Sequence, residues 1–240
     1  MRILTAHNYY QIRGGEDECF EAEIQLLREM GEDVEIYQEN NDRVAEISKL
    51  RMAADTIWSK EAYEKIKHKL INKPLDVVHI HNFFPLISPS IYYAAKAQGV
   101  PVVQTLHNYR LICPNALFFR EGKVCEDCLE KFIPYPGIQH GCYRGNKVAS
   151  GAVATMLGVH RAMNTWAKMV DLYICLTQFA KQKFIQAGIP AEKIVVKPNF
   201  VSPEPTVGSG KGGYALFVGR LSVEKGLDTL LAAWEQLGEQ

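Results

Sequence analysis

Residues 75–106, LDVVHIHNFFPLISPSIYYAAKAQGVPVVQTL, hold two short apolar runs separated by a segment of helical period. The runs cover residues 75–80 and 100–105, and the helical segment covers residues 91–97. Strands that are apolar on both faces and separated by helices are typical of a parallel sheet covered on both sides. The sequence therefore predicts a doubly wound α/β domain of the Rossmann-like kind over residues 1–201. Its other runs lie at residues 3–6, 34–37, 172–176 and 194–196, and its other helical segments at residues 19–30, 148–166 and 179–187.

A change of composition after residue 201 marks the end of this domain. Residues 202–213, SPEPTVGSGKGG, hold two prolines and four glycines without an apolar period, which is typical of a linker. Lys211 in this linker is followed by glycine instead of Ser or Thr, which argues against a phosphate-binding loop. Residues 214–218 are predicted to form a strand, followed by a helix with one apolar face. One strand and one helix cannot close a core, so we expect residues 214–240 to begin a second domain whose remainder is missing from this chain.

Composition excludes several classes of protein. Lys plus Arg and Asp plus Glu both number 27, so no net charge would draw the chain onto nucleic acid or an anionic membrane. The amino terminus lacks a secretory leader, and no stretch reaches the roughly 18 apolar residues that a membrane span requires. We expect a cytoplasmic protein. Residues 147–168 mix apolar and basic residues; a helix covering the sheet is favoured, and peripheral contact with the inner face of the membrane stays open.

A glycine pair, Gly14 and Gly15, falls between the first predicted strand and the first predicted helix. Backbone amides at such a turn can hold an anionic or polar group, although a glycine pair at this place is more often only a turn. The acidic residues Glu16, Asp17 and Glu18 follow directly and would repel a phosphate if they pointed at it. The dinucleotide pattern Gly-x-Gly-x-x-Gly is absent, which argues against an NAD-dependent oxidoreductase.

Three histidines lie near the carboxyl ends of predicted strands. His79 and His81 close one apolar run, and His107 follows another. Ligands of open α/β sheets bind at this edge, although a histidine at a strand end is often a structural group with satisfied hydrogen bonds. A metal site is not expected here, because the spacing of the histidines is poor for metal ligands and no nearby carboxylate completes a site.

Four cysteines occur in a loop-like insert at about residues 108–146. Cys125 and Cys128 form one Cys-x-x-Cys, and Cys113 and Cys142 flank it at comparable distances. A tetrahedral thiolate site for structural zinc would cross-link a segment that has little core of its own. Reduced packed thiols, an iron–sulfur cluster and disulfides remain alternatives.

The run FVGRLSVEKGL at residues 217–227 closely resembles the Gly-Arg-Leu-x-x-x-Lys-Gly signature of glycosyltransferase family 4, the group 1 retaining enzymes of the GT-B fold. The resemblance extends along most of the chain. Further matching segments are the turn Gly14-Gly15-Glu16, DVVHIH at residues 76–81, TLHN at residues 105–108 and KPN at residues 197–199.

The resemblance implies two facing Rossmann-like domains, with the acceptor side formed by residues 1–201 and the donor side beginning at residue 214. Residues matching Arg220 and Lys225 contact the donor diphosphate in this family. The residue matching His107 lies against the donor sugar as a catalytic group, and the loop matching Gly14 and Gly15 approaches the donor phosphate and sugar. The alternative is that the two cations are surface charges near a helix start.

The implied activity is transfer of a hexose, with retention, from a nucleotide diphosphate sugar to a glycan, a lipid-linked or a small-molecule acceptor. A guanidinium and an ammonium can neutralise the diphosphate leaving group, so no catalytic cofactor is expected. The family's paired glutamates and its base pocket are missing from these 240 residues, and we expect this chain alone to be inactive. A non-catalytic sugar-binding or nucleotide-sugar-binding regulatory protein of the same fold is the alternative.

Overall fold

A six-stranded sheet forms the centre of the computed structural model, which describes residues 1–237. All neighbouring strands of this sheet are parallel, in the order β2-β1-β3-β4-β7-β8. The predicted doubly wound, Rossmann-like α/β domain is thereby confirmed. The strands are β1 (Arg2–Tyr9), β2 (Asp33–Asn40), β3 (Val77–Asn82), β4 (Val102–Leu106), β7 (Leu172–Cys175) and β8 (Ile194–Val196).

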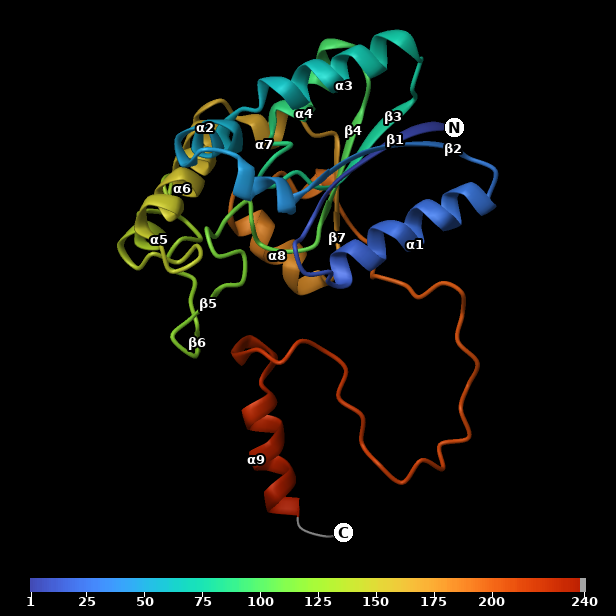
Figure 1. Cartoon of the computed structure of the whole chain (residues 1–240), viewed down its shortest axis with the longest axis vertical. Coiled ribbons are helices and arrows are strands. Elements are labelled where there is room, and N and C mark those ends of the chain that lie inside the picture. Colours follow the sequence, from blue (N-terminus) through green and yellow to red (C-terminus); the bar gives the residue numbers. More distant parts are fainter. Residues whose placement is uncertain (238–240) are drawn as a thin grey trace.

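Helices connect these strands and cover the sheet (Figure 1). Several begin at a side-chain cap: the oxygens of Ser48, Ser59, Asn146 and Thr177 accept from backbone amides in the first turns of α2, α3, α6 and α8. The α-helices are α1 (Gly15–Glu29), α2 (Lys49–Ile57), α3 (Lys60–Asn72), α4 (Ser90–Ala97), α5 (Tyr135–Gln139), α6 (Lys147–Ala162), α7 (Thr165–Lys168), α8 (Gln178–Gln186) and α9 (Leu227–Leu237); the 3-10 helices are η1 (Asn41–Glu46), η2 (Ala191–Lys193) and η3 (Val223–Lys225).

Side chains on the two faces of β2 pack against different helices. Val34 packs in a small cluster with Phe20 and Ile24 of α1, whereas Tyr37 belongs to the large core that includes α3. This alternation follows from the period of two along a strand, and α1 and α3 lie on opposite sides of the β1–β2 pair (Figure 1).

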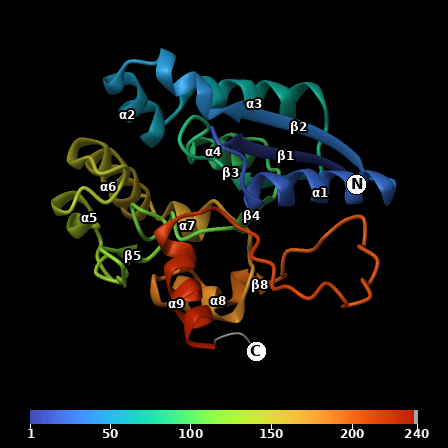
Figure 2. The ribbon, with the colours of Figure 1, turned by 60° about the horizontal axis from the view of Figure 1, so that its bottom comes forward.

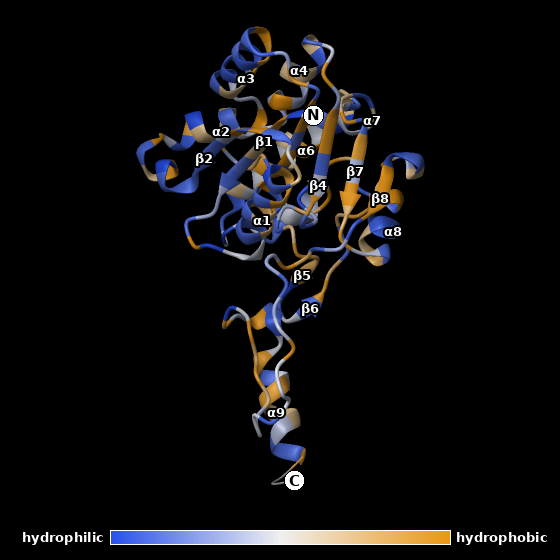
Figure 3. Ribbon diagram, turned by 90° about the vertical axis from the view of Figure 1, so that its right-hand side faces the viewer, coloured by the Kyte–Doolittle hydropathy of each residue, from blue (hydrophilic) through white to orange (hydrophobic). Residues whose placement is uncertain are grey.

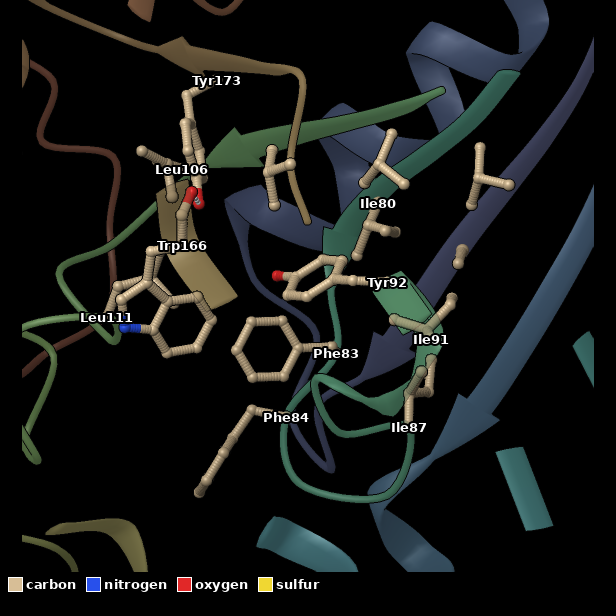
Figure 4. Close-up of a cluster of buried hydrophobic side chains, with 14 of the residues drawn as sticks. Ile80, Phe83, Phe84, Ile87, Ile91, Tyr92, Leu106, Leu111, Trp166 and Tyr173 are labelled. Atoms are coloured by element: carbon tan, nitrogen blue, oxygen red, sulfur yellow. Dashed lines mark hydrogen bonds between the residues drawn. The ribbon is translucent and has the colours of Figure 1, made fainter. Parts of the chain in front are cut away.

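The large core is rich in aromatic rings (Figure 4). The ring of Phe83 lies 5.8 Å from that of Tyr92 on α4 and 6.5 Å from that of Trp166 on α7, measured between centroids. The Tyr92 hydroxyl donates to Gln104 Oε1 at 2.8 Å, which satisfies both groups inside the core. Strands β7 and β8 are hydrophobic along their length (Figure 3), although Val195 of the edge strand β8 is 42% exposed.

The predicted insert separates β4 from α6. It contains a two-stranded antiparallel sheet of β5 (Phe119–Arg120) and β6 (Lys123–Val124), followed by the short helix α5. The insert and helices α5 and α6 lie together on one side of the molecule (Figure 2).

The structure after β8 differs from the prediction in one respect. Residues 214–218 carry no strand, and Tyr214 and Leu216 are exposed. A strand requires a neighbour for its backbone hydrogen bonds, and the described residues provide none here. Helix α9 does form as predicted, with Leu230 and Trp234 on its exposed apolar face. No helix among residues 1–237 is long and apolar enough to cross a bilayer.

Candidate functional site

Four histidines meet at the carboxyl edge of the sheet. His7 lies on β1, His79 and His81 lie on β3, and His107 follows β4. His81 Nδ1 and His107 Nε2 are 3.1 Å apart, and the centroids of the His7 and His81 rings are 6.4 Å apart. Because parallel strands end at one edge, the fold brings the three predicted histidines together and adds His7. Strands β2 and β3 lie on opposite sides of β1, so the direction of the strand order reverses at β1. Ligands of open α/β sheets usually bind at the carboxyl end of the sheet next to such a reversal.

Burial keeps the imidazoles of His79, His81 and His107 neutral. Desolvation lowers the pKa of His79 to about 4 and that of His107 to about 3. It also holds the pKa of His81 well below its usual value. Neutral imidazoles can donate or accept hydrogen bonds, but they provide no charge to neutralise a phosphate.

Several nitrogen atoms at this edge lack a partner. His79 Nε2 lies 2.8 Å from Thr105 Oγ1, so that nitrogen is satisfied. His7 Nδ1, His81 Nε2 and His107 Nδ1 are buried without a hydrogen bond. Buried polar atoms are usually paired, so unpaired ones in one cluster mark a place where a polar ligand can bind.

The glycine turn lies beside the histidines, at the start of α1. The Gly14 amide donates to Asp17 Oδ2 at 2.9 Å, and His7 Nε2 lies 2.7 Å from Asp17 Oδ1. Burial alone would raise the pKa of Asp17, but the hydrogen bonds from His7 and Gly14 outweigh it and lower that pKa. Asp17 therefore stays ionised, and both of its oxygens are directed to His7 and the Gly14 amide. Gly15, the second glycine of the pair, is exposed at this turn.

A second set of polar side chains, those of Tyr10, Glu16 and Asn108, lies between α1 and the residues after β4. Glu16 Oε2 accepts from Tyr10 Oη at 2.9 Å and from Asn108 Nδ2 at 3.1 Å, and burial raises the pKa of Glu16 to about 7. The Arg110 guanidinium lies 4.3 Å from the centroid of the Phe84 ring. Tyr10 and Arg110 were not predicted from the sequence. The usable signal was their proximity to the Gly14-Gly15 turn and to His107.

A carboxylate and two histidines form a metal-ligand group, which differs from the expectation that no nearby carboxylate completes a site with the histidines. Glu23 of α1, His79 and His81 each place one ligand atom within 4.8 Å of the others. Helix α1 supplies this carboxylate from a distant part of the sequence. Glu23 Oε2 is nevertheless bound by Lys197 Nζ at 2.8 Å, so an ammonium already balances its charge.

The predicted diphosphate contacts lie apart from this edge. Arg220 and Lys225 belong to the segment around η3, and Arg220 Nη2 pairs with Glu224 Oε1 at 3.4 Å. Within residues 1–237, no hydrogen bond or ion pair joins either cation to the histidines or the glycine turn. Gly226 next to Lys225 has φ of 68°, a conformation that favours glycine and separates η3 from α9.

The predicted cysteine group does come together. Cys113, Cys125, Cys128 and Cys142 line one enclosed cavity of about 10 Å³, and none of them forms a disulfide.

A comparison with protein families identifies the family of the chain. Residues 21–205 match the family model described as Glycosyltransferase Family 4. No curated protein was found to match. Similar solved structures are those of HepE from Anabaena in complex with UDP, with UDP-glucose, and with UDP and glucose. They are 16% identical, have TM-scores of 0.41, 0.41 and 0.42, and align over 83% of this chain and 44% of each HepE chain. The chain thus spans less than half the length of these proteins.

Proposed function

The chain belongs to glycosyltransferase family 4, and on that premise we propose that it carries the acceptor-side half of a retaining enzyme. The proposed reaction transfers a hexose from a nucleoside diphosphate sugar to an acceptor. Residues 1–201 are the acceptor-side domain, residues 202–213 the linker, and residues from 214 onward the beginning of the donor-side domain. The observation that carries the proposal is the set of neutral, partly unpaired histidines beside the glycine turn.

His107 is proposed to contact the donor sugar. Its Nδ1 has no partner, so a sugar hydroxyl can form the missing hydrogen bond. Breaking a glycosidic bond gives the sugar oxocarbenium character, with positive charge near the anomeric carbon. With a pKa of about 3, His107 stays neutral at pH 7 and does not repel that charge.

The diphosphate needs positive charge from another part of the protein. Arg220 and Lys225 are the proposed source, because a guanidinium fork and an ammonium stabilise a departing diphosphate without a metal. Their segment lies beyond the carboxyl ends of the strands, on the side of the histidine edge (Figures 1 and 3). Gly14 and Gly15 are proposed to approach the donor from the opposite side of the site.

The acceptor is proposed to bind near Glu16 and Asn108, beside the glycine turn. The proposed step needs no side-chain nucleophile, because the leaving phosphate can take the proton of the acceptor hydroxyl on the same face of the sugar. Asp17 and Glu23 also lie at this edge, but His7 and Lys197 already engage their carboxylates.

Steady-state transfer from radiolabelled nucleotide sugars tests the proposal in a chain continued through a complete second domain. Arg220→Ala and Lys225→Ala should each lower kcat about a hundredfold, since removing a hydrogen-bond donor to transition-state charge typically costs that much. His107→Ala should also lower kcat. Lys211→Ala, a loss of the same charge from the linker, should change it little.

Two other outcomes would overturn the proposal. Equal and modest losses in the variants at Arg220, Lys225 and Lys211 would mean that these cations act only through general basicity. Donor binding with no transfer to any acceptor would instead favour the non-catalytic nucleotide-sugar-binding protein.

A further inference from the structure

The insert between β4 and α6 places four thiols around one cavity. Cys113 lies in the turn after β4, Cys125 and Cys128 follow β6, and Cys142 follows α5. Their cavity of about 10 Å³ is close to the minimum that holds one water-sized particle. We propose that this cavity is a structural zinc site in which the four Sγ atoms are the ligands.

The backbone of the insert positions the cysteines. The amides of Cys113, Cys125 and Cys142 donate to the carbonyls of Tyr109, Phe118 and Gly137 at 2.8, 2.8 and 2.9 Å. Gly137 allows α5 to approach the turn that carries Cys113, because a Cβ there would lie 2.6 Å from Pro114 Cγ. Three of the four thiols thus belong to ordered turns that face a common cavity.

The insert has little regular secondary structure to hold it in place. Its regular structure consists of two strands of two residues each and one helix of five. The non-glycine residues Ala116, Phe118, Glu121 and Arg144 all adopt positive φ in this segment. Such conformations are strained and persist only where the surroundings hold them. A four-thiolate zinc site would supply that restraint.

Charge at the cavity is suited to thiolates. Arg120 lines the cavity and pairs with Asp127 Oδ2 at 2.9 Å, so a guanidinium lies beside the net negative charge that zinc with four thiolates would carry. Zinc binds cysteine as the thiolate, so zinc binding must release the protons of these thiols.

The histidine edge is the competing site for a metal. Within the described part of the chain, the three-ligand group already within 4.8 Å is Glu23, His79 and His81, so the four thiols surround their cavity more loosely. Zinc–sulfur bonds of about 2.3 Å would draw them inward. The histidine group is the weaker competitor, because Lys197 already balances Glu23 and Thr105 occupies one nitrogen of His79. Zinc should therefore prefer the thiols and tighten the insert.

Elemental analysis of the purified chain as it stands is the first test. We expect about one zinc per chain, lost in Cys125→Ser and Cys128→Ser and retained in His81→Gln. Cys175→Ser removes a buried thiol outside the insert and should also retain zinc. Zinc lost only in His81→Gln, iron in place of zinc, disulfides, or no metal with four freely titratable thiols would each overturn the proposal.

Measurements on the wild-type chain avoid the risk that a cysteine variant misfolds. Removing metal with a chelator should speed proteolysis within residues 114–141, and added zinc should reverse the effect while releasing protons. Cobalt added to the stripped chain should give the charge-transfer and d–d bands of tetrahedral tetrathiolate coordination. Cobalt spectra without thiolate charge transfer would contradict the site. None of these readouts involves sugar transfer, so the zinc site and the proposed function can fail independently.

Discussion

Replacing His79 by Gln should make the domain less sensitive to acid by about 2 kcal/mol between pH 7 and pH 5. His79 is 6% exposed, and burial lowers its pKa from 6.5 to about 4. Between these values the unfolded chain binds a proton that the folded chain does not, so stability falls as the pH falls. For these two pKa values the linkage amounts to about 2 kcal/mol over this interval. Gln removes the titrating group and can still form a hydrogen bond with Thr105.

Glu16→Gln provides a matched change of opposite sign. Burial raises the pKa of Glu16 from 4.5 to about 7, so the folded chain keeps a proton that the unfolded chain releases. Glu16 therefore adds about 2 kcal/mol of stability between pH 7 and pH 5, and the Gln variant should lose that gain. The wild type should lie between the two variants in its sensitivity to acid.

Urea denaturation followed by far-ultraviolet circular dichroism at pH 5, 6 and 7 measures both effects. Each variant carries its own cost at pH 7, so the informative quantity is the change in unfolding free energy with pH. His68→Gln, which replaces an exposed histidine of α3, should leave this change close to that of the wild type. Equal pH dependence for His79→Gln, Glu16→Gln and wild type would refute the reasoning.

Two further predictions concern packing. Ile66→Ala should cost about 2–5 kcal/mol in urea denaturation because Ile66 is fully buried, whereas Leu50→Ala, at an 87% exposed position, should cost little. Gly137→Ala should speed proteolysis of the insert, because its methyl group would lie 2.6 Å from Pro114 Cγ. Gly151→Ala in α6 meets no atom within 4 Å and should leave that proteolysis unchanged while raising helix stability by about 0.5–1 kcal/mol.

The sheet was predictable because strands that are buried on both faces appear in the sequence as short continuous apolar runs. Apolar runs at residues 3–6 and 75–80 need no tertiary information to be identified as strands. Helices α2 and α3 were not predicted, and in α3 many charged residues lie between the apolar ones. The signal in α3 was the four-residue spacing of Ala62, Ile66 and Leu70, all of which are buried.

The candidate site was predictable only in part. His79, His81 and His107 could be assigned to one edge because each follows or ends an apolar run. The partners of this edge could not be assigned, since Asp17 and Glu23 are brought to it by the packing of α1. A carboxylate far away in the sequence leaves no local pattern that connects it with a strand-end histidine.

The proposed function requires an uncharged group beside the donor sugar and positive charge beside the diphosphate. A cation beside the anomeric carbon would oppose the positive charge that develops on the donor sugar, whereas a cation beside the diphosphate would stabilise the leaving group. Burial keeps His107 uncharged on one side of the linker, and Arg220 and Lys225 carry charge on the other. The donor has His107 beside its sugar and Arg220 and Lys225 beside its diphosphate only when the residues before and after the linker meet around it. In the proposed enzyme, closure of the two domains thus becomes a condition for bond breaking, and it protects the nucleotide sugar from breakdown while the site is open.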